Sequence, residues 1–213
     1  MKVFLFRHGE KEKILSDNFE KVNSALLTSK GIAQIAKLGQ YLKIIFPELS
    51  NLSQIFTSPL SRSLQSAEVI QKMLGIENIV IDDTFYELYV TKDLKKMKDE
   101  HLITKSLLNP HISFGPRGSI NSQVEKIIQY LHESQSNGEK LMLVSTHSIL
   151  IRALCYHLDP MLQPPPNQMK AGKLHEASLT ILSVNNTDIT IQIFNEYSFL
   201  PTQLQYQMYN RGE

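Results

Sequence analysis

Short apolar runs alternate with amphipathic stretches along this sequence of 213 residues. The apolar runs predict buried strands at 2–7, 54–58, 78–81 and 140–146. Between them, apolar residues recur at helical spacing, which predicts helices at 28–46, 58–70, 119–136 and 147–158. Thr28 and Ser58 are expected as N-caps, with Pro59 in the first helical position. This alternation is typical of an α/β sheet with helices on both faces.

Two stretches of alternating polarity in the last quarter of the chain, 177–184 and 188–195, predict a hairpin turning at Asn185-Asn186-Thr187. We therefore predict one three-layer α/β/α domain over residues 1–213, with a mostly parallel sheet that the hairpin makes mixed. Residues 11–27 have no clear period and are expected to form a polar loop. Residues 83–118 carry few periodic apolar positions, end in Gly115-Pro116-Arg117-Gly118 and are expected to form a cap or lid. Five lysines lie in this insertion: Lys92, Lys95, Lys96, Lys98 and Lys105.

The amino-acid composition argues against several classes of protein. Lysine and arginine number 22 against 21 acidic residues, so the net charge is +1, which argues against a nucleic-acid partner. The one cysteine, Cys155, excludes an internal disulfide framework. No apolar run approaches the ~20 residues that a membrane span needs. Arg7 and His8 interrupt the first apolar run, so we expect no secretory signal and a cytoplasmic location.

Three predicted strands each end in a polar cluster. The clusters are Arg7-His8-Gly9-Glu10, Thr57-Ser58-Pro59-Leu60-Ser61-Arg62 and Val144-Ser145-Thr146-His147-Ser148. Because the carboxyl ends of parallel neighbouring strands meet at one edge of a sheet, these clusters are expected to converge. They would bring together two guanidiniums and two imidazoles, which suit the oxygens of a phosphoryl group.

These motifs resemble those of the histidine phosphatase superfamily, which includes the cofactor-dependent phosphoglycerate mutases. Arg7-His8-Gly9-Glu10 is similar to the first signature and Leu27-Thr28-x-x-Gly31-x-x-Gln34 to the first-helix pattern. Thr57-Ser58-Pro59-Leu60-x-Arg62-x-x-x-Ser66-Ala67 and Leu143-Val144-Ser145-Thr146-His147 resemble the second and third signatures, and 191–199 resembles the closing strand. The matches follow the family order along essentially the whole chain.

The resemblance implies a role for each matching residue. His8 is expected to be the nucleophile, and Arg7, Arg62 and His147 are expected to bind the phosphoryl group. Glu87, in Phe85-Tyr86-Glu87-Leu88, resembles the general acid. We expect no cofactor and no metal. The other five histidines (His101, His111, His132, His157 and His175) show no metal-ligand spacing.

Simple chemistry supports these roles. An attacking imidazole must be neutral, so nearby positive charges should lower the pKa of His8, and a hydrogen bond to its other nitrogen should fix the tautomer. Partial burial should raise the pKa of Glu87 so that it can donate a proton.

Several departures favour a phosphatase with a small phosphorylated substrate over a mutase. Ile14 stands near the position of an asparagine in the mutases, and Ser148 replaces a glycine. Gly118-Ser119 stands where the family has Gly-Glu-Ser, without the glutamate. The stretch of chain between Glu87 and His147 is also short for a mutase. A mutase and a binding module without turnover remain alternatives. The substrate and the oligomeric state stay open.

Overall fold

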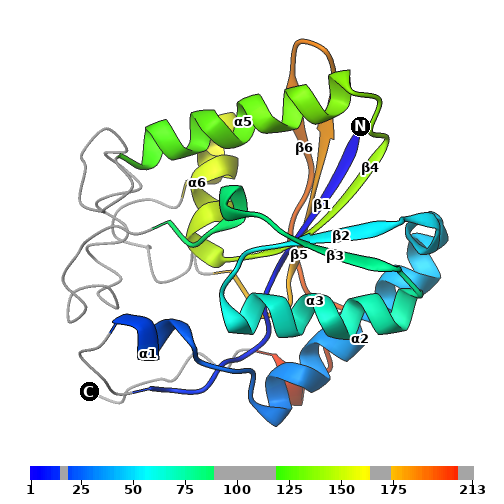
Figure 1. Ribbon diagram of the computed structural model, residues 1–213, viewed down its shortest axis with the longest axis vertical. Helices are drawn as coiled ribbons and strands as arrows, with labels where there is room; N and C mark the ends of the chain where they lie inside the picture. The colour runs from blue at the N-terminus through cyan, green and yellow to red at the C-terminus, as the bar shows by residue number, and fades with distance from the viewer. Residues whose placement is uncertain (15–18, 89–118, 164–173, 206–213) are drawn as a thin grey trace.

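The computed structural model describes residues 1–14, 19–88, 119–163 and 174–205. Its centre is a six-stranded sheet in the order β3-β2-β4-β1-β5-β6 (Figure 1). The strands are β1 (Lys2–Arg7), β2 (Gln54–Thr57), β3 (Asn78–Ile81), β4 (Leu141–Thr146), β5 (Leu179–Val184) and β6 (Ile189–Glu196). Pairs β1–β4, β4–β2 and β2–β3 are parallel, while β5 runs antiparallel to β1 and β6. The predicted mixed sheet with a closing hairpin is confirmed.

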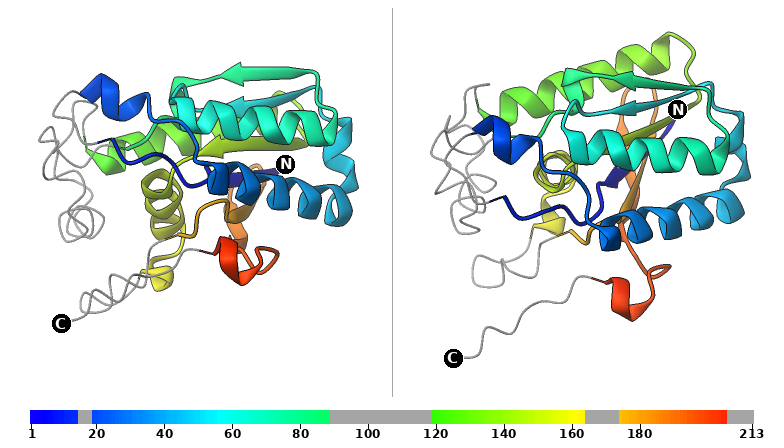
Figure 2. Two further views of the ribbon diagram at one scale, coloured as in Figure 1. Left: turned by 90° about the horizontal axis from the view of Figure 1, so that it is seen from below. Right: turned by 60° about the horizontal axis from the view of Figure 1, so that its bottom comes forward.

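Helices cover both faces of this sheet, as predicted (Figures 1 and 2). They are α2 (Ser29–Ile45) and α3 (Ser61–Leu74) on one face, and α5 (Ile120–Ser136) and α6 (Ser148–Leu158) on the other. Strand β1 shows why its apolar run is unbroken: Phe4 and Phe6 pack under α2 and α3, while Val3 and Leu5 pack under α5 and α6. Successive side chains of a strand point to opposite faces, so a strand covered on both sides needs apolar residues throughout.

Of the two helix caps predicted from the sequence, one is confirmed and one is wrong. Thr28 caps α2 by accepting a hydrogen bond from the N–H of Gly31, and Ser119 caps α5 in the same way. The prediction that Ser58 caps the next helix was wrong. Helix α3 begins at Ser61, after Leu60 as the N-cap residue, so Pro59 also lies outside the helix. The hydroxyl of Ser58 lies 2.7 Å from Nε2 of His147 and accepts from the N–H of Leu60, which precedes the helix.

Shorter elements complete the described chain. Within the predicted loop 11–27, the structure has a five-residue helix, α1 (Phe19–Asn23), which is too short to show a period in the sequence. The 3₁₀ turns are η1 (Pro47–Asn51), η2 (Asp83–Phe85), η3 (Pro160–Leu162) and η5 (Thr202–Leu204). The predicted insertion begins with η2, but its residues 89–118, with all five lysines, lie outside the described residues. None of the described helices is both long enough and apolar enough to cross a membrane.

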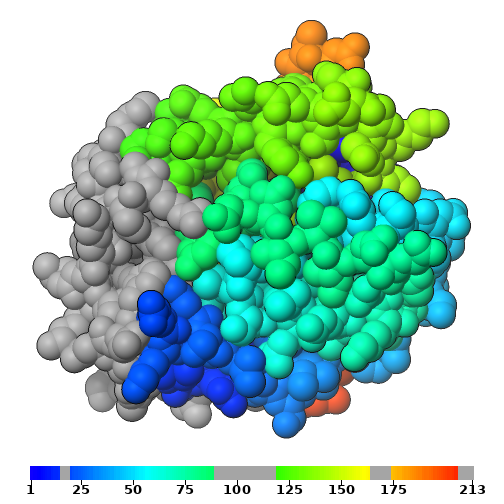
Figure 3. Space-filling view, in the orientation of Figure 1, coloured from blue at the N-terminus to red at the C-terminus, as the bar shows by residue number. Residues whose placement is uncertain are grey.

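The sheet order decides where a site can form. Strands β1, β4 and β2 are neighbours and parallel, so their carboxyl ends lie side by side. Strand β2 meets β4 at Phe56 and Thr57 only, which are its last two residues, and the N–H of Ser58 then donates to the carbonyl of Ser145 at 3.2 Å. The contact between these strands is therefore concentrated at the edge that carries the polar clusters. In Figure 3, α3 and α5 form the surface of one side, with β3 and the residues that follow it between them.

Candidate active site

The structure brings all five predicted site residues together at this sheet edge. Nε of Arg62 lies 3.2 Å from Nε2 of His8, and the rings of His8 and His147 meet edge to face with centroids 5.2 Å apart. Oε2 of Glu87 lies 3.6 Å from Nδ1 of His147 and 3.9 Å from Nη2 of Arg62. Arg7 precedes His8 at the end of β1, and its side chain is also nearly buried.

Close backbone packing holds the first cluster in place. A Cβ on Gly9 would lie 2.4 Å from the carbonyl oxygen of Gly31, and one on Gly31 would lie 2.0 Å from that of Glu10. Only glycine permits this approach between the turn after β1 and the first turn of α2. Thr28 and Gln34 then bind Glu10: Thr28 donates from its N–H and its hydroxyl, and the Gln34 side chain accepts from the Glu10 N–H.

In the second signature, Ser66 connects the turn after β1 to helix α3 through its hydroxyl. The N–H of Gly9 donates to the hydroxyl of Ser66 at 3.3 Å, and that hydroxyl donates to the carbonyl of Arg62 at 2.7 Å. Ser66 is completely buried one turn after Arg62 on α3. It therefore joins the turn that carries His8 to the helix that carries Arg62.

The tautomer of His8 follows from its hydrogen bonds. Nδ1 lies 2.7 Å from the carbonyl oxygen of Gly9, which only accepts, so Nδ1 carries the hydrogen. Nε2 then bears the lone pair, and the Nε–H of Arg62 donates to it. The pKa of His8 is held well below its ordinary value, mainly by burial and then by the charges of Arg62 and Arg7. The sequence analysis expected only the nearby positive charges to lower the pKa of His8, whereas burial lowers it more.

His147 is also buried and uncharged near neutral pH. Its side chain is fully enclosed, and burial, followed by the charge of Arg62, lowers its pKa well below the ordinary value. Nε2 lies 2.7 Å from the hydroxyl of Ser58, which accepts a hydrogen bond from the N–H of Leu60 at 3.3 Å. When the Ser58 hydroxyl donates to Nε2, Nδ1 of His147 carries the hydrogen and is a donor on the side of Glu87.

Glu87 has the properties of a group that exchanges protons near neutral pH. Only 15% of its side chain is exposed, and burial raises its pKa to about 7 against the opposing charges of Arg62 and Arg7. Among the described residues, its Oε1 has no hydrogen-bond partner. Since a carboxyl with a pKa near the working pH can both give and take a proton, the arrangement suits acid–base chemistry at this point.

A comparison with protein-family models identifies the family of this chain. A family model described as the histidine phosphatase superfamily (branch 1) matches residues 3–197. This chain belongs to the histidine phosphatase superfamily. The resemblance carried by the strand-end motifs is thereby confirmed. A comparison with curated proteins finds no match.

Several solved structures share the fold. A phosphoserine phosphatase from Entamoeba histolytica, solved as a mutant with phosphoserine, has 22% identity and a TM-score of 0.66 over 94% of this chain and 99% of its own. A mycobacterial glucosyl-3-phosphoglycerate phosphatase, solved with inorganic phosphate, has 16% identity and a TM-score of 0.65 over 94% and 99%. A phosphoglycerate mutase from Bacillus anthracis has 15% identity and a TM-score of 0.66 over 93% and 94%. At these identities the likeness shows the fold alone.

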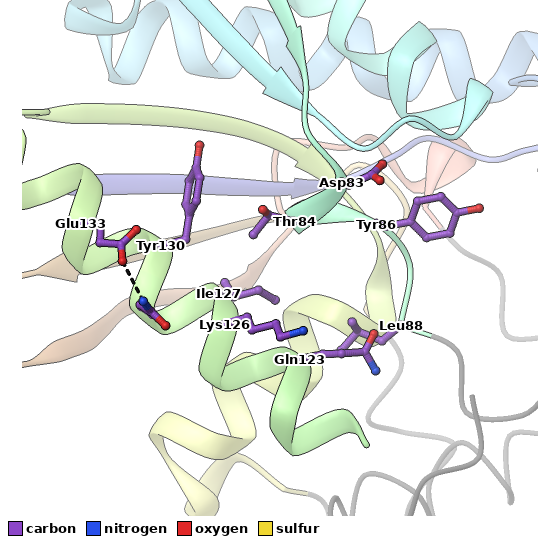
Figure 4. Close-up of a pocket in the computed structure, with 10 residues that line it drawn as sticks. Asp83, Thr84, Tyr86, Leu88, Gln123, Lys126, Ile127, Tyr130 and Glu133 are labelled. Carbon is purple, nitrogen blue, oxygen red and sulfur yellow. Dashed lines mark hydrogen bonds between the residues drawn. The ribbon is translucent and has the colours of Figure 1, made fainter. Parts of the chain in front are cut away.

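A cavity of about 550 Å³ lies between the segment around η2 and helix α5. Figure 4 shows its walls coming from η2 and the residues after it on one side and from α5 on the other. Tyr86 and Leu88 line this cavity, whereas Glu87 between them faces His147 and Arg62. The segment that carries Glu87 therefore contributes both to the wall of the cavity and to the cluster around His147 and Arg62. Among the described residues, no cluster of histidine, cysteine, aspartate and glutamate has a geometry that would hold a metal ion.

Two contacts of the site were missed from the sequence. The contact of Ser58 with His147 has a signal, because Ser58 directly follows β2, but the residue was assigned to a helix cap. Glu176 forms an ion pair with Arg7 at 2.8 Å, although the two residues lie near opposite ends of the chain. No local pattern marks Glu176, since its turn carries neither a motif nor a period.

Proposed function

We propose that this chain is a phosphatase that hydrolyses a small phosphomonoester through a phosphohistidine on His8, without a metal ion. One observation carries the proposal: the His8 ring has its Nδ1–H bound to the Gly9 carbonyl and presents the lone pair of Nε2 to Arg62. A buried imidazole with a lowered pKa stays neutral, and a neutral imidazole with a fixed tautomer is a nucleophile at nitrogen.

In the first step, Nε2 of His8 attacks phosphorus in line with the leaving oxygen. The N–P bond forms as the P–O bond breaks, and the leaving alcohol takes a proton from Glu87. The raised pKa of Glu87, about 7, keeps a large share of this carboxyl protonated at neutral pH. A positioned proton donor typically contributes ~10²–10⁴ in rate.

Three side chains are suited to hold the transferring oxygens. The guanidiniums of Arg7 and Arg62 supply forked N–H donors, which match phosphate oxygens better than a point charge does. His147 adds a neutral donor at Nδ1 if Ser58 donates to its Nε2. Positive charge fixed in a buried site stabilises developing negative charge without reorganisation, so these groups supply what a metal ion supplies elsewhere.

In the second step, water hydrolyses the phosphohistidine. Glu87, now a carboxylate, takes a proton from the water as its oxygen attacks phosphorus. The N–P bond breaks, inorganic phosphate leaves and His8 regains its lone pair. The same carboxyl therefore acts first as acid and then as base, which requires a pKa near the working pH.

The substrate is proposed to be a small phosphorylated molecule. Two structural relatives are phosphatases whose substrates or bound ligands carry a phosphate on a small hydroxyl compound. Phosphoserine and 3-phosphoglycerate are therefore sensible first probes, beside p-nitrophenyl phosphate as a general phosphomonoester.

The test is to trap the intermediate. The full chain is mixed with radiolabelled phosphoserine or p-nitrophenyl phosphate in the presence of EDTA and quenched in alkali. We expect label that is stable to base and labile to acid, and its loss in His8→Ala. His157→Ala, which removes an exposed histidine on α6, is the matched control and should keep the label. Full labelling of His8→Ala contradicts the proposal.

Phosphoglycerate mutase activity is the second candidate, because a mutase shares the fold. It requires transfer to a second hydroxyl and a bisphosphate primer. The departures from the mutase pattern at Ile14 and Ser148 favour water as the acceptor. Adding 2,3-bisphosphoglycerate to an assay with 3-phosphoglycerate separates the two: release of inorganic phosphate without primer supports the phosphatase, and primer-dependent isomerisation supports the mutase.

A further inference from the structure

The turn before β5 holds the backbone of Arg7 and His8. The N–H of Arg7 donates to the carbonyl of Ser178 at 3.0 Å, and the N–H of Ala177 donates to the carbonyl of His8 at 3.3 Å. The turn closes with a bond from the Ser178 N–H to the carbonyl of His175 at 3.2 Å. Ala177 has φ of 59°, in the left-handed region that residues other than glycine rarely occupy. The chain keeps this unfavourable conformation at a turn that contacts the Arg7–His8 backbone.

Glu176 lies in the centre of that turn and binds the Arg7 side chain. Its Oε1 is 2.8 Å from Nη2 of Arg7, and the two side chains are only 9% and 11% exposed. Nη1 of Arg7 donates to the carbonyl oxygen of Leu174, at the start of the same turn. Two contacts on two different nitrogens fix the plane of the guanidinium, which a single contact would leave free to rotate.

The N–H groups of Arg7 that do not bind Glu176 or Leu174 are the donors with which this side chain can bind a ligand. Nε of Arg7 has no hydrogen-bond partner among the described residues, although it is buried. Each terminal nitrogen also keeps a second hydrogen beyond the one bound to Glu176 or Leu174. These donors belong to a side chain at the end of β1, next to His8. Glu176 itself carries only acceptors when ionised and would repel a phosphate, so any effect it has on an anion must act through Arg7.

We propose that Glu176 is a positioning residue for the phosphoryl site, which holds the Arg7 guanidinium so that its remaining donors face the bound anion. The inference rests on the proposed function, because it assigns phosphate binding to Arg7. It predicts that Glu176 matters for phosphate affinity only while Arg7 is present. A carboxylate that merely stabilises the fold would instead affect stability and leave phosphate affinity of the folded protein unchanged.

The test is a double-mutant cycle on the binding of inorganic phosphate to the full chain, measured by calorimetry. Glu176→Ala should weaken binding by about tenfold or more, the size expected when a charge-assisted hydrogen bond is lost. In an Arg7→Ala background the same change should alter binding by less than about twofold, because the group it acts through is gone. Glu176→Gln keeps an oxygen that accepts from Nη2 and should stay within about threefold of the wild type.

Two further variants keep the cycle interpretable. Glu48→Ala removes a partly exposed carboxylate that lies 4.0 Å from Lys2, and as the matched control it should leave phosphate binding unchanged. If thermal unfolding shows that Glu176→Ala does not fold, Glu176→Asp replaces it. The aspartate keeps the charge but is one methylene shorter, so it should weaken binding in the wild type and not in Arg7→Ala.

Equal weakening by the Glu176 variant with and without Arg7, or no weakening in the wild type, overturns the inference. Trapping of phosphohistidine in the same preparation separates this from the proposed function. If His8 is labelled but the effects of the Glu176 and Arg7 substitutions on phosphate binding are additive, the proposed function stands and the inference about Glu176 fails. If the two substitutions are coupled but no label is trapped on His8, Glu176 positions Arg7 and the phosphohistidine route is wrong. A wild type that neither binds phosphate nor takes label overturns both.

Discussion

The Nε–H of Arg62 donates to Nε2 of His8 at 3.2 Å, so a guanidinium lies on the ring nitrogen that is proposed to attack phosphorus. Both residues are buried, with 5% and 4% of their surfaces exposed. A phosphoryl group that approaches Nε2 must take the place of this hydrogen bond. The Arg62 guanidinium can then donate to the phosphoryl oxygens. It therefore binds the nucleophile His8 before the substrate arrives and binds the substrate afterwards.

Replacing Arg62 tests this double role. We expect Arg62→Ala to lower kcat/KM for p-nitrophenyl phosphate by about 10²–10³, the usual loss when one donor to developing negative charge is removed. Arg62→Lys keeps the charge but not the fork and should recover only part of the loss. Lys72→Ala removes an exposed cation near the other end of α3 and is the matched control. Wild-type kinetics in Arg62→Ala would remove this residue from the site.

The pH dependence of activity should report Glu87. As the proton donor it must be protonated, and its pKa is raised to about 7, so kcat/KM should fall as the pH rises above about 7. Glu87→Gln should lower kcat/KM for phosphoserine by ~10²–10⁴ and remove this fall. The measurement is a pH profile from pH 5 to 9 for both proteins. A basic limb that persists in Glu87→Gln would assign the titration to another group.

The leaving group offers a separate check on Glu87. The p-nitrophenolate ion leaves without a proton, whereas the serine alkoxide needs one. The loss of the phosphorylation rate in Glu87→Gln should therefore be smaller for p-nitrophenyl phosphate than for phosphoserine, which single-turnover kinetics measures. An equal loss for both substrates would argue that Glu87 acts on another step.

Burial of Glu87 also makes stability depend on pH. Its pKa in the folded protein, about 7, lies above the ordinary 4.5, so the folded state prefers the protonated carboxyl. The stability this gives is fully present below pH 4.5 and is lost as the pH rises through about 7. Glu87→Gln should therefore raise the free energy of unfolding at pH 9 by up to about 3 kcal/mol and change it little at pH 4.5. Urea unfolding at both pH values measures this, and an equal change at both would contradict it.

Gly31 should tolerate no side chain. A Cβ there would lie 2.0 Å from the carbonyl oxygen of Glu10, and a backbone atom cannot move aside without shifting the turn after His8. We expect Gly31→Ala to destabilise the protein by about 3 kcal/mol and to lower activity as well. Gly39→Ala is the matched control on the same helix, because its Cβ would meet the flexible Met73 side chain, which can move. Urea unfolding compares the two, and equal costs would contradict the prediction.

Local patterns in the sequence were sufficient for most of the fold. The strand 2–7 has the predicted bounds, because an unbroken apolar run of that length suits only an element covered on both faces. Thr28 and Ser119 start helices because their hydroxyls satisfy N–H groups only three residues away. Convergence of His8, Arg62 and His147 was also predictable, since each follows a strand and parallel strands end at one edge.

Tertiary packing alone decided the rest. Ser58 has the sequence of a helix cap, but its hydroxyl contacts His147, which is far from it in the chain. Glu176 meets Arg7 from the other end of the sequence, and the pKa values of His8 and Glu87 depend first on burial. The physical reason is one of range: a strand or a cap depends on neighbours within a few residues, whereas an ion pair and a desolvated carboxyl depend on which distant segments pack together. The sequence by itself thus determined the elements and the residue types at the sheet edge, and only the tertiary structure decided their partners and their charge states.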